Sequence, residues 1–140
     1  MATPTPREII DRRRRLVLDK DADGFADLFA ADGVVELPFA PPGMPRRIEG
    51  RDAIRAFSSH AFSPRVRIDD LSASAVYETT DPEVVIVEVE SRGTVTATGR
   101  PFQGTSVQVF RVRDGEIVLF RDYWNPQGLA EALHAITDRT

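Results

Sequence analysis

The second half of the chain constrains the fold most, because four of its segments alternate between apolar and polar residues with a period of two. These segments are Val66 to Tyr77, Val84 to Thr98, Thr105 to Arg113 and Glu116 to Trp124. Asp114-Gly115 is a two-residue hairpin signal, and Gly99 can take the positive φ of a turn between the second and third segments. The pattern predicts four strands joined as an antiparallel meander.

The first half of the chain has helical periodicity instead. Apolar residues recur at helical spacing from Arg7 to about Asp19, which predicts a first helix. Asp21 can cap a second helix that ends at Asp32-Gly33, and a third helix is expected from Arg51 to about His60.

The remaining segments complete the expected order of elements. The residues from Gly33 to Pro38 are predicted to form a strand, and the proline-rich stretch from Pro38 to Pro45 is predicted to form a loop. Asn125-Pro126 can begin a closing helix with apolar positions at Leu129, Leu133 and Ile136. Helices segregated from an antiparallel sheet predict an α+β domain, and a long twisted sheet curled over a few helices leaves room for an internal pocket.

Composition narrows the classes of function. The chain of 140 residues is expected to form one domain, 1–140, and its net charge of −4 argues against a nucleic-acid partner. It has no cysteine, which excludes disulfides, thiolate zinc sites and a cysteine nucleophile. The two histidines are far apart and no metal-ligand spacing occurs, so we expect neither metal nor cofactor. Without an apolar run for a signal peptide or a membrane span, the expected location is cytoplasmic, with no membrane partner.

The last predicted strand carries the main candidate for chemistry, Asp122. Alternation places Val118, Phe120, Asp122 and Trp124 on one face, and Ile117, Leu119, Arg121 and Tyr123 on the other. A carboxylate among aromatic side chains loses hydration, which raises its pKa and makes it a general acid or base near neutral pH. The alternative is a structural aspartate that pairs with an arginine.

The first helix offers a partner for that aspartate. Arg13 lies at helical spacing from Ile9 and Ile10, so it shares their apolar face. It would act as a substrate clamp or as an ion pair that keeps Asp122 charged, and spacing alone does not decide whether Arg13 or Arg14 faces the pocket.

His60 shares one side of the third predicted helix with Ala53 and Phe57. It is either a boundary residue of the core or an assistant in catalysis.

Three segments, Leu28 to Phe39, Ile48 to Ile54 and Gly115 to Pro126, resemble the SnoaL-like or ketosteroid isomerase-like superfamily, which has the nuclear transport factor fold. The resemblance implies a curved antiparallel sheet wrapped around helices, also described as a cystatin-like roll, with a cone-shaped internal pocket. It also implies a homodimer formed through the outer face of the sheet.

The catalytic residues of steroid isomerases are missing under this resemblance. The position of their aspartate base is occupied by Leu37, and their oxyanion pair falls on Arg13 and about Val107. Steroid isomerisation by that route is therefore not expected.

The resemblance to limonene-type epoxide hydrolases and to PhzA/PhzB phenazine proteins converges on one acidic position, Asp122. The other members of the hydrolase Asp-Arg-Asp set fall on Val89 and Ser91, and the residues that hold its water fall on Val35 and Leu37. In the phenazine proteins a glutamate thought to donate a proton occupies the place of Asp122.

These inferences predict a cofactor-independent general acid–base enzyme of isomerase, cyclase or hydrolase type, acting on a small apolar or polyketide-like molecule. Asp122 would be the acid or base, with Arg13 and His60 assisting. The predicted substrate contacts are Arg14, Val35, Leu37, Phe57, Val89, Ser91, Val107, Phe120 and Trp124. The alternative is a non-catalytic module that binds a small ligand or serves as a dimeric interaction domain.

Overall fold

The computed structural model describes residues 3–61 and 66–125, which form three helices and six strands. None of these helices has both the length and the apolar character needed to cross a membrane. In chain order the elements are α1 (Pro6–Leu18), α2 (Ala22–Asp27), β1 (Phe29–Glu36), β2 (Arg47–Glu49), α3 (Arg51–Ala61), β3 (Val66–Glu78), β4 (Val84–Val95), β5 (Arg100–Arg113) and β6 (Glu116–Trp124).

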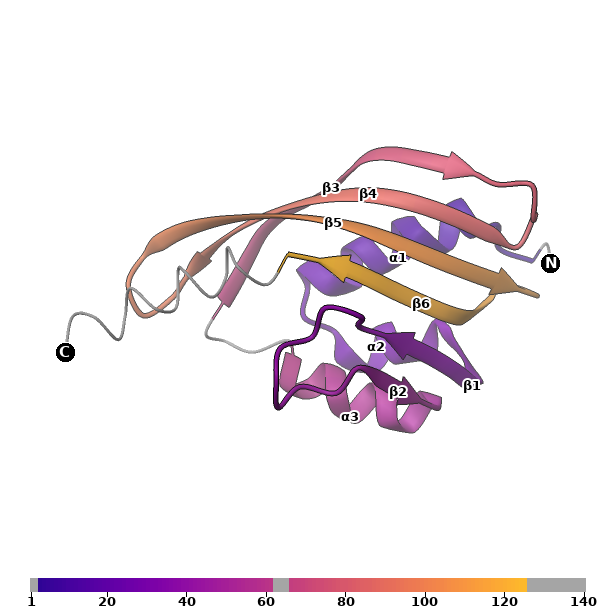
Figure 1. The fold of residues 1–140 in the computed structure, drawn as a ribbon, viewed down its shortest axis with the longest axis horizontal. Coiled ribbons are helices and arrows are strands. Elements are labelled where there is room, and N and C mark those ends of the chain that lie inside the picture. The colour runs from indigo at the N-terminus through magenta and orange to yellow at the C-terminus, as the bar shows by residue number, and fades with distance from the viewer. Residues whose placement is uncertain (1–2, 62–65, 126–140) are drawn as a thin grey trace.

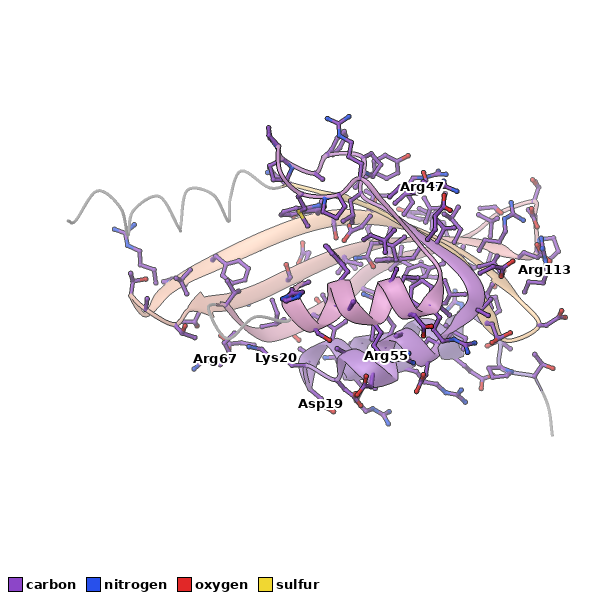
Figure 2. The ribbon with its side chains drawn as sticks, turned by 90° about the horizontal axis from the view of Figure 1, so that it is seen from below. Asp19, Lys20, Arg47, Arg55, Arg67 and Arg113 are labelled. Carbon is purple, nitrogen blue, oxygen red and sulfur yellow. The ribbon has the colours of Figure 1, made fainter. Side chains whose placement is uncertain are left out.

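All six strands belong to one sheet with the order β2-β1-β6-β5-β4-β3. The meander from β3 to β6 is antiparallel throughout, as predicted, whereas β1 pairs with β6 in parallel. The long strands curve, and one end of β4 and β5 extends beyond the helices (Figures 1 and 2). This is the predicted α+β architecture of a curved sheet around helices.

Local signals in the sequence explain where the elements begin and end. Thr5 and Glu8 form a capping box at the start of α1, and Pro6 occupies the first helical position. The hairpin between β5 and β6 turns at Asp114 and Gly115, which have φ values of 54° and 78°, as a tight turn of this kind requires.

The hydrophobic core lies between the helices and the inner face of the sheet. Phe29, Ile54 and Phe110 are fully buried in it. The Phe110 ring lies 4.8 Å from that of Phe120, and Phe25 makes edge contacts with both Phe29 and Phe120. These aromatic contacts connect α2 with β1, β5 and β6, and so fix the helical layer relative to the strand that carries Asp122.

Several boundaries differ from the sequence-based expectations. Helix α2 ends at Asp27, and Asp32-Gly33 lies inside β1, because Phe29 already pairs with Ile117 in the sheet. Strand β2 was not expected, and β5 begins at Arg100, earlier than the predicted Thr105. The predicted closing helix after Asn125 lies outside the described residues.

The alternation predicted for β6 is wrong at its first half. Ile117 is fully buried in the same core as Phe120, although simple alternation places the two on opposite faces. The cause is a register shift in the pairing with β5: Val112 pairs with Ile117, but the preceding Arg111 pairs with Leu119. The extra residue turns Ile117 inward and leaves the predicted face of Asp122 unchanged.

Gly93 provides a test of the packing between β3 and β4. A Cβ atom at Gly93 would collide with the backbone carbonyl oxygen of Arg67 and with the Phe102 ring. We expect Gly93→Ala to lower the free energy of unfolding by about 1–3 kcal/mol, measured by urea denaturation. The matched control is Gly104→Ala in β5, where the added Cβ meets only the rotatable Ser91 hydroxyl. Equal stability of the two variants would contradict this account.

Candidate active site

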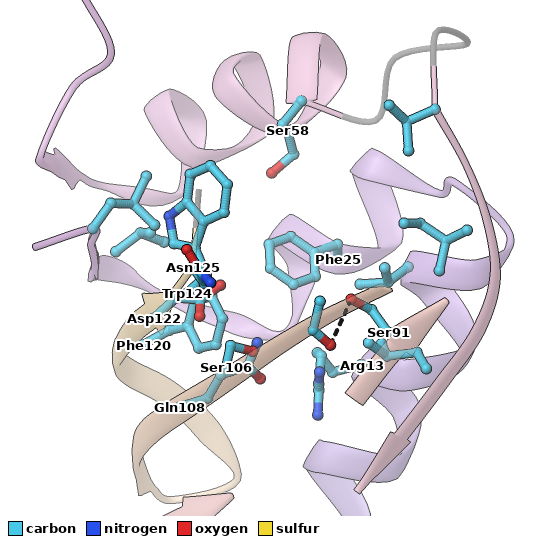
Figure 3. A pocket seen from close by; sticks show the side chains of 18 of the residues that line it. Arg13, Phe25, Ser58, Ser91, Ser106, Gln108, Phe120, Asp122, Trp124 and Asn125 are labelled. Carbon is cyan, nitrogen blue, oxygen red and sulfur yellow. Dashed lines mark hydrogen bonds between the residues drawn. The ribbon is translucent and has the colours of Figure 1, made fainter. Parts of the chain in front are cut away.

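A cavity of about 970 Å³ opens between the inner face of the sheet and the helices. Every helix and every strand except β2 contributes to its lining. Figure 3 shows the labelled side chains Asp122, Gln108 and Arg13 around this one cavity. Most of the predicted site residues line it, namely Arg13, Val35, Leu37, Phe57, His60, Ser91, Phe120, Asp122 and Trp124.

Three predicted substrate contacts lie elsewhere. The Arg14 side chain donates a hydrogen bond to the Leu71 carbonyl and forms a 3.3 Å ion pair with Asp70 on β3, which settles that Arg13 faces the cavity. Val89 is packed in the core at 2% exposure. Val107, at 37% exposure, belongs to the exposed large hydrophobic residues and is not among the residues that line the cavity.

Asp122 is held on β6 directly opposite Gln108 of β5. Its Oδ1 atom is buried and has no hydrogen-bond partner. Burial raises the pKa of Asp122 to about 6, because a charged carboxylate is poorly solvated there. The positive charge of Arg13 and a hydrogen bond with Gln108 act in the opposite direction but do not cancel the effect of burial.

Arg13 brings a buried cation to the same cavity. The residue is only 3% exposed, its Nε atom has no hydrogen-bond partner, and its Cζ atom lies 5.4 Å from the centre of the Phe110 ring. Burial lowers the pKa of Arg13 to about 10, while the negative charges of Asp122 and Asp11 favour the cation. Arg13 therefore remains positively charged at neutral pH.

Arg13 and Asp122 attract each other without direct contact. The ion pairs formed by the described residues, all with N–O distances of 4.0 Å or less, do not include one between these two side chains. The sequence left two roles open for Arg13, a substrate clamp or an ion pair that keeps Asp122 charged. The structure does not show that ion pair.

Gln108 is a site residue that the sequence reasoning missed. It is 6% exposed, and its Oε1 atom is buried without a hydrogen-bond partner. Alternation along β5 places Gln108 on the same face as Ser106 and Phe110. A polar residue at such an inward position could have identified Gln108 as a site residue from the sequence. Ser58 of α3, which is 2% exposed and lines the cavity, was missed as well.

The walls of the cavity are mainly apolar, and its charged groups are few. Phe25, Phe57, Phe120 and Trp124 supply aromatic surface. His60, at the end of α3, is an exposed member of the lining, so it lies where the cavity meets solvent. Among residues 3–61 and 66–125, no three histidine, aspartate or glutamate side chains gather in a way that could hold a metal ion.

The arrangement joins a proton carrier that titrates near neutral pH to a cation, within a cavity of low polarity. The carboxyl group can accept or donate a proton, and the guanidinium can stabilise negative charge on a ligand oxygen. Both effects are stronger where water is excluded.

The stability of the protein should report the burial of Asp122. Its pKa in the folded state, about 6, lies above the ordinary value of 3.8, so its favourable contribution is complete below that ordinary value and is lost as pH rises through about 6. We expect Asp122→Asn to match the wild type near pH 4 and to exceed it by about 2–3 kcal/mol near pH 8, measured by urea denaturation. The control is Asp70→Asn, an exposed aspartate. The expectation fails if the stability difference between Asp122→Asn and wild type does not change with pH.

Comparison with known proteins agrees with the resemblance seen in the sequence. The model of the SnoaL-like domain family matches residues 11–120. An uncharacterized PhzA/B-like protein from Pseudomonas aeruginosa is 40% identical over 134 residues, which cover 93% of this chain and 91% of that protein.

Solved structures show the same similarity. The structure of a putative isomerase from Bacillus subtilis superposes with a TM-score of 0.85 at 34% identity and covers 91% of each chain. A protein from Catenulispora acidiphila with a ketosteroid isomerase-like fold shares the fold at 19% identity, with a TM-score of 0.74 over 92% of this chain and 93% of that one. The chain therefore belongs to the SnoaL-like domain family and has the ketosteroid isomerase-like fold.

Proposed function

We propose that the protein is a cofactor-independent enzyme that transfers a proton on a small apolar carbonyl compound held in the cavity. One observation carries the proposal: the Asp122 carboxyl, with a pKa of about 6, shares a largely apolar cavity with the buried cation of Arg13. An acid–base catalyst works best when its pKa lies near the operating pH.

The proposed chemistry begins with ionised Asp122 as the base. The carboxylate takes the proton from a carbon next to the substrate carbonyl, and the electron pair of that C–H bond moves toward the carbonyl oxygen. Arg13 stabilises the resulting enolate oxygen. Return of the proton to another carbon completes an isomerisation. Alternatively, the enolate carbon attacks a second carbonyl group of the same molecule to form a ring, and the proton held by Asp122 passes to the alkoxide oxygen that results.

The apolar walls support this division of roles. Phe57, Phe120 and Trp124 would enclose the substrate and exclude water, which strengthens the effect of the two charged groups. Val35 and Leu37 line the cavity where the family resemblance implies polar catalytic residues, so the chemistry rests on Asp122 and Arg13. His60 would assist only at the entrance.

Proton transfer can be tested without knowing the natural substrate. The probe is 2-tetralone, an enolisable aromatic ketone, whose exchange of α-protons in D₂O is followed by NMR. We expect wild type to accelerate exchange, and Asp122→Asn to reduce that acceleration by about 10²–10⁴-fold, because the base is lost. Asp70→Asn, on β3 and outside the cavity lining, is the matched control and should keep the wild-type rate. Exchange by Asp122→Asn at the wild-type rate would refute the role of Asp122.

The rate of exchange should also follow the titration of Asp122. Because the base is the ionised form, kcat/KM should rise with pH through about 6 and level off above it. A profile measured from about pH 4.5 to about pH 8.5 tests this, with phosphate-free buffers of constant ionic strength. A profile that falls as pH rises through about 6 would show that Asp122 acts in its protonated form, against the mechanism above.

The second candidate function is binding without catalysis, as a ligand-binding or dimeric interaction module. The apolar side chains of Val35 and Leu37 favour a binding function, since they add hydrophobic surface to the cavity without adding a catalytic group. Val107, exposed at 37%, offers apolar surface for a second copy of the chain. A binder would show 2-tetralone affinity that changes in Asp122→Asn, with no acceleration of exchange in either protein.

A further inference from the structure

Several polar atoms of the residues that line the cavity have no hydrogen-bond partner. The described side chains contain three buried polar atoms without a hydrogen-bond partner: Arg13 Nε, Gln108 Oε1 and Asp122 Oδ1. All three belong to residues that line the cavity. Buried polar groups are rarely left unpaired in proteins, so these three atoms point to a polar ligand group in the cavity.

Arg13 sets the charge of that ligand group. A neutral carbonyl can accept a hydrogen bond from a buried guanidinium, but only an anion also compensates its charge. Asp122 acts on Arg13 through its charge but not by contact, because the ion pairs of the described residues include none between these two side chains. A carboxylate has the planar, two-oxygen geometry that a guanidinium binds best.

A second negative charge in the cavity has a consequence for Asp122. The ligand carboxylate and an ionised Asp122 would repel each other in surroundings of low polarity, and like charges of this kind favour protonation of one partner. Asp122 can take up that proton, since burial already disfavours its charged form. Protonated Asp122 then becomes a hydrogen-bond donor for a ligand oxygen or for Gln108 Oε1.

We propose that the cavity binds small apolar carboxylic acids, with the ligand carboxylate against the Arg13 guanidinium and with one proton taken up by Asp122 on binding. This inference deepens the proposed function, on which it rests for the site and for the proton-carrying role of Asp122. It defines apolar acids as ligands that compete with the carbonyl substrate, because a bound acid holds Asp122 in the protonated form, in which it cannot act as the base. The aromatic lining from Phe25, Phe57, Phe120 and Trp124 fits a flat hydrocarbon body.

Few other charged groups face the cavity from the elements that pack against it. In the described lining, the only charged or titratable side chains besides Arg13 and Asp122 are Lys20, after α1, and His60 of α3. Asp11 and Arg14 act on Arg13 from within α1. Strands β1, β3, β4 and β5 contribute no charged side chain to the described lining, so His60 is the lining side chain at which a control variant is placed.

The probes are 2-naphthoate and 2-naphthamide, which have the same ring and nearly the same shape but differ in charge. Titration calorimetry of wild type should give tighter binding of naphthoate than of naphthamide at about pH 6. Naphthoate affinity should fall by up to about tenfold per pH unit above pH 6, while naphthamide affinity stays constant. Measurements at about pH 8 in two buffers of different ionisation enthalpy should show uptake of about one proton per naphthoate bound, because Asp122 is ionised in the free protein at that pH.

Variants test which residues cause the pH dependence of naphthoate binding and the preference for naphthoate over naphthamide. In Asp122→Asn, which mimics the protonated carboxyl, naphthoate should bind equally well across the pH range and more tightly than wild type at about pH 8. Arg13→Met should lose about 10–1000-fold in naphthoate affinity while it keeps naphthamide affinity. His60→Gln should retain the wild-type pH dependence. The wild-type comparison of the two probes needs no variant and stands even if Arg13→Met does not fold.

Equal affinity of wild type for the two probes, or naphthoate binding without proton uptake, would overturn the proposal. Retention of the pH dependence in Asp122→Asn, or its loss in His60→Gln, would overturn the assignment to Asp122. Failure here is distinguishable from failure of the proposed function, because that function is judged by 2-tetralone exchange. Loss of exchange in Asp122→Asn without carboxylate preference would leave the proposed function standing and reject only the carboxylic acids as ligands.

Discussion

The Asp122 carboxyl lies on the inner face of β6, where burial destabilises its charged form more than Arg13 and Gln108 stabilise it. This balance depends on the rest of the structure. The parallel pairing of β1 with β6 makes β6 an interior strand, and the meander places Gln108 beside Asp122. Helix α1 brings Arg13 under the sheet, where the Phe110 ring fixes the position of its guanidinium. If the carboxyl were solvated, neither the acid–base chemistry nor the selection of an anionic ligand would follow.

The separation of Arg13 from Asp122 matters as much as their proximity. A direct ion pair would hold the carboxyl ionised and engage the guanidinium, which leaves little capacity for a ligand. At a longer distance each group influences the charge of the other and still has unpaired atoms. Two incompletely paired buried groups destabilise the folded state, and groups perturbed in this way are concentrated at functional sites. By contrast, the Arg113–Glu83 and Arg111–Glu83 pairs are direct, at 2.9 Å and 3.0 Å, and belong to a surface network.

Much of the fold followed from local patterns. The period of two, the Asp114-Gly115 turn and the apolar face of α1 were sufficient for the meander, the hairpin and the first helix. Pairings between distant segments were not readable in this way. Phe29 has helical spacing from Phe25, but its pairing with Ile117 makes it the first residue of β1. The three residues of β2 are too few to carry a pattern, and they form a strand because β1 is beside them.

In the candidate site, too, local patterns placed some residues, whereas others required contacts between distant segments. Alternation was enough to place Asp122 with Phe120 and Trp124, because the register shift in β6 lies before them. The choice between Arg13 and Arg14 required the contacts of Arg14 with Leu71 and Asp70, which are more than fifty residues away in the sequence. Val89 and Val107 were selected by resemblance, and their positions in the core and outside the cavity lining show that aligned positions need not share surroundings.

The most direct test of the account is the pKa of the Asp122 carboxyl itself. It can be measured by following the ¹³C chemical shift of the Asp122 Cγ atom against pH, with the resonance assigned by its absence from the spectrum of Asp122→Asn. We expect a midpoint of about 6, because burial disfavours the charged carboxylate. A midpoint at or below the ordinary value of 3.8 would show a solvated or directly paired carboxylate and would contradict it.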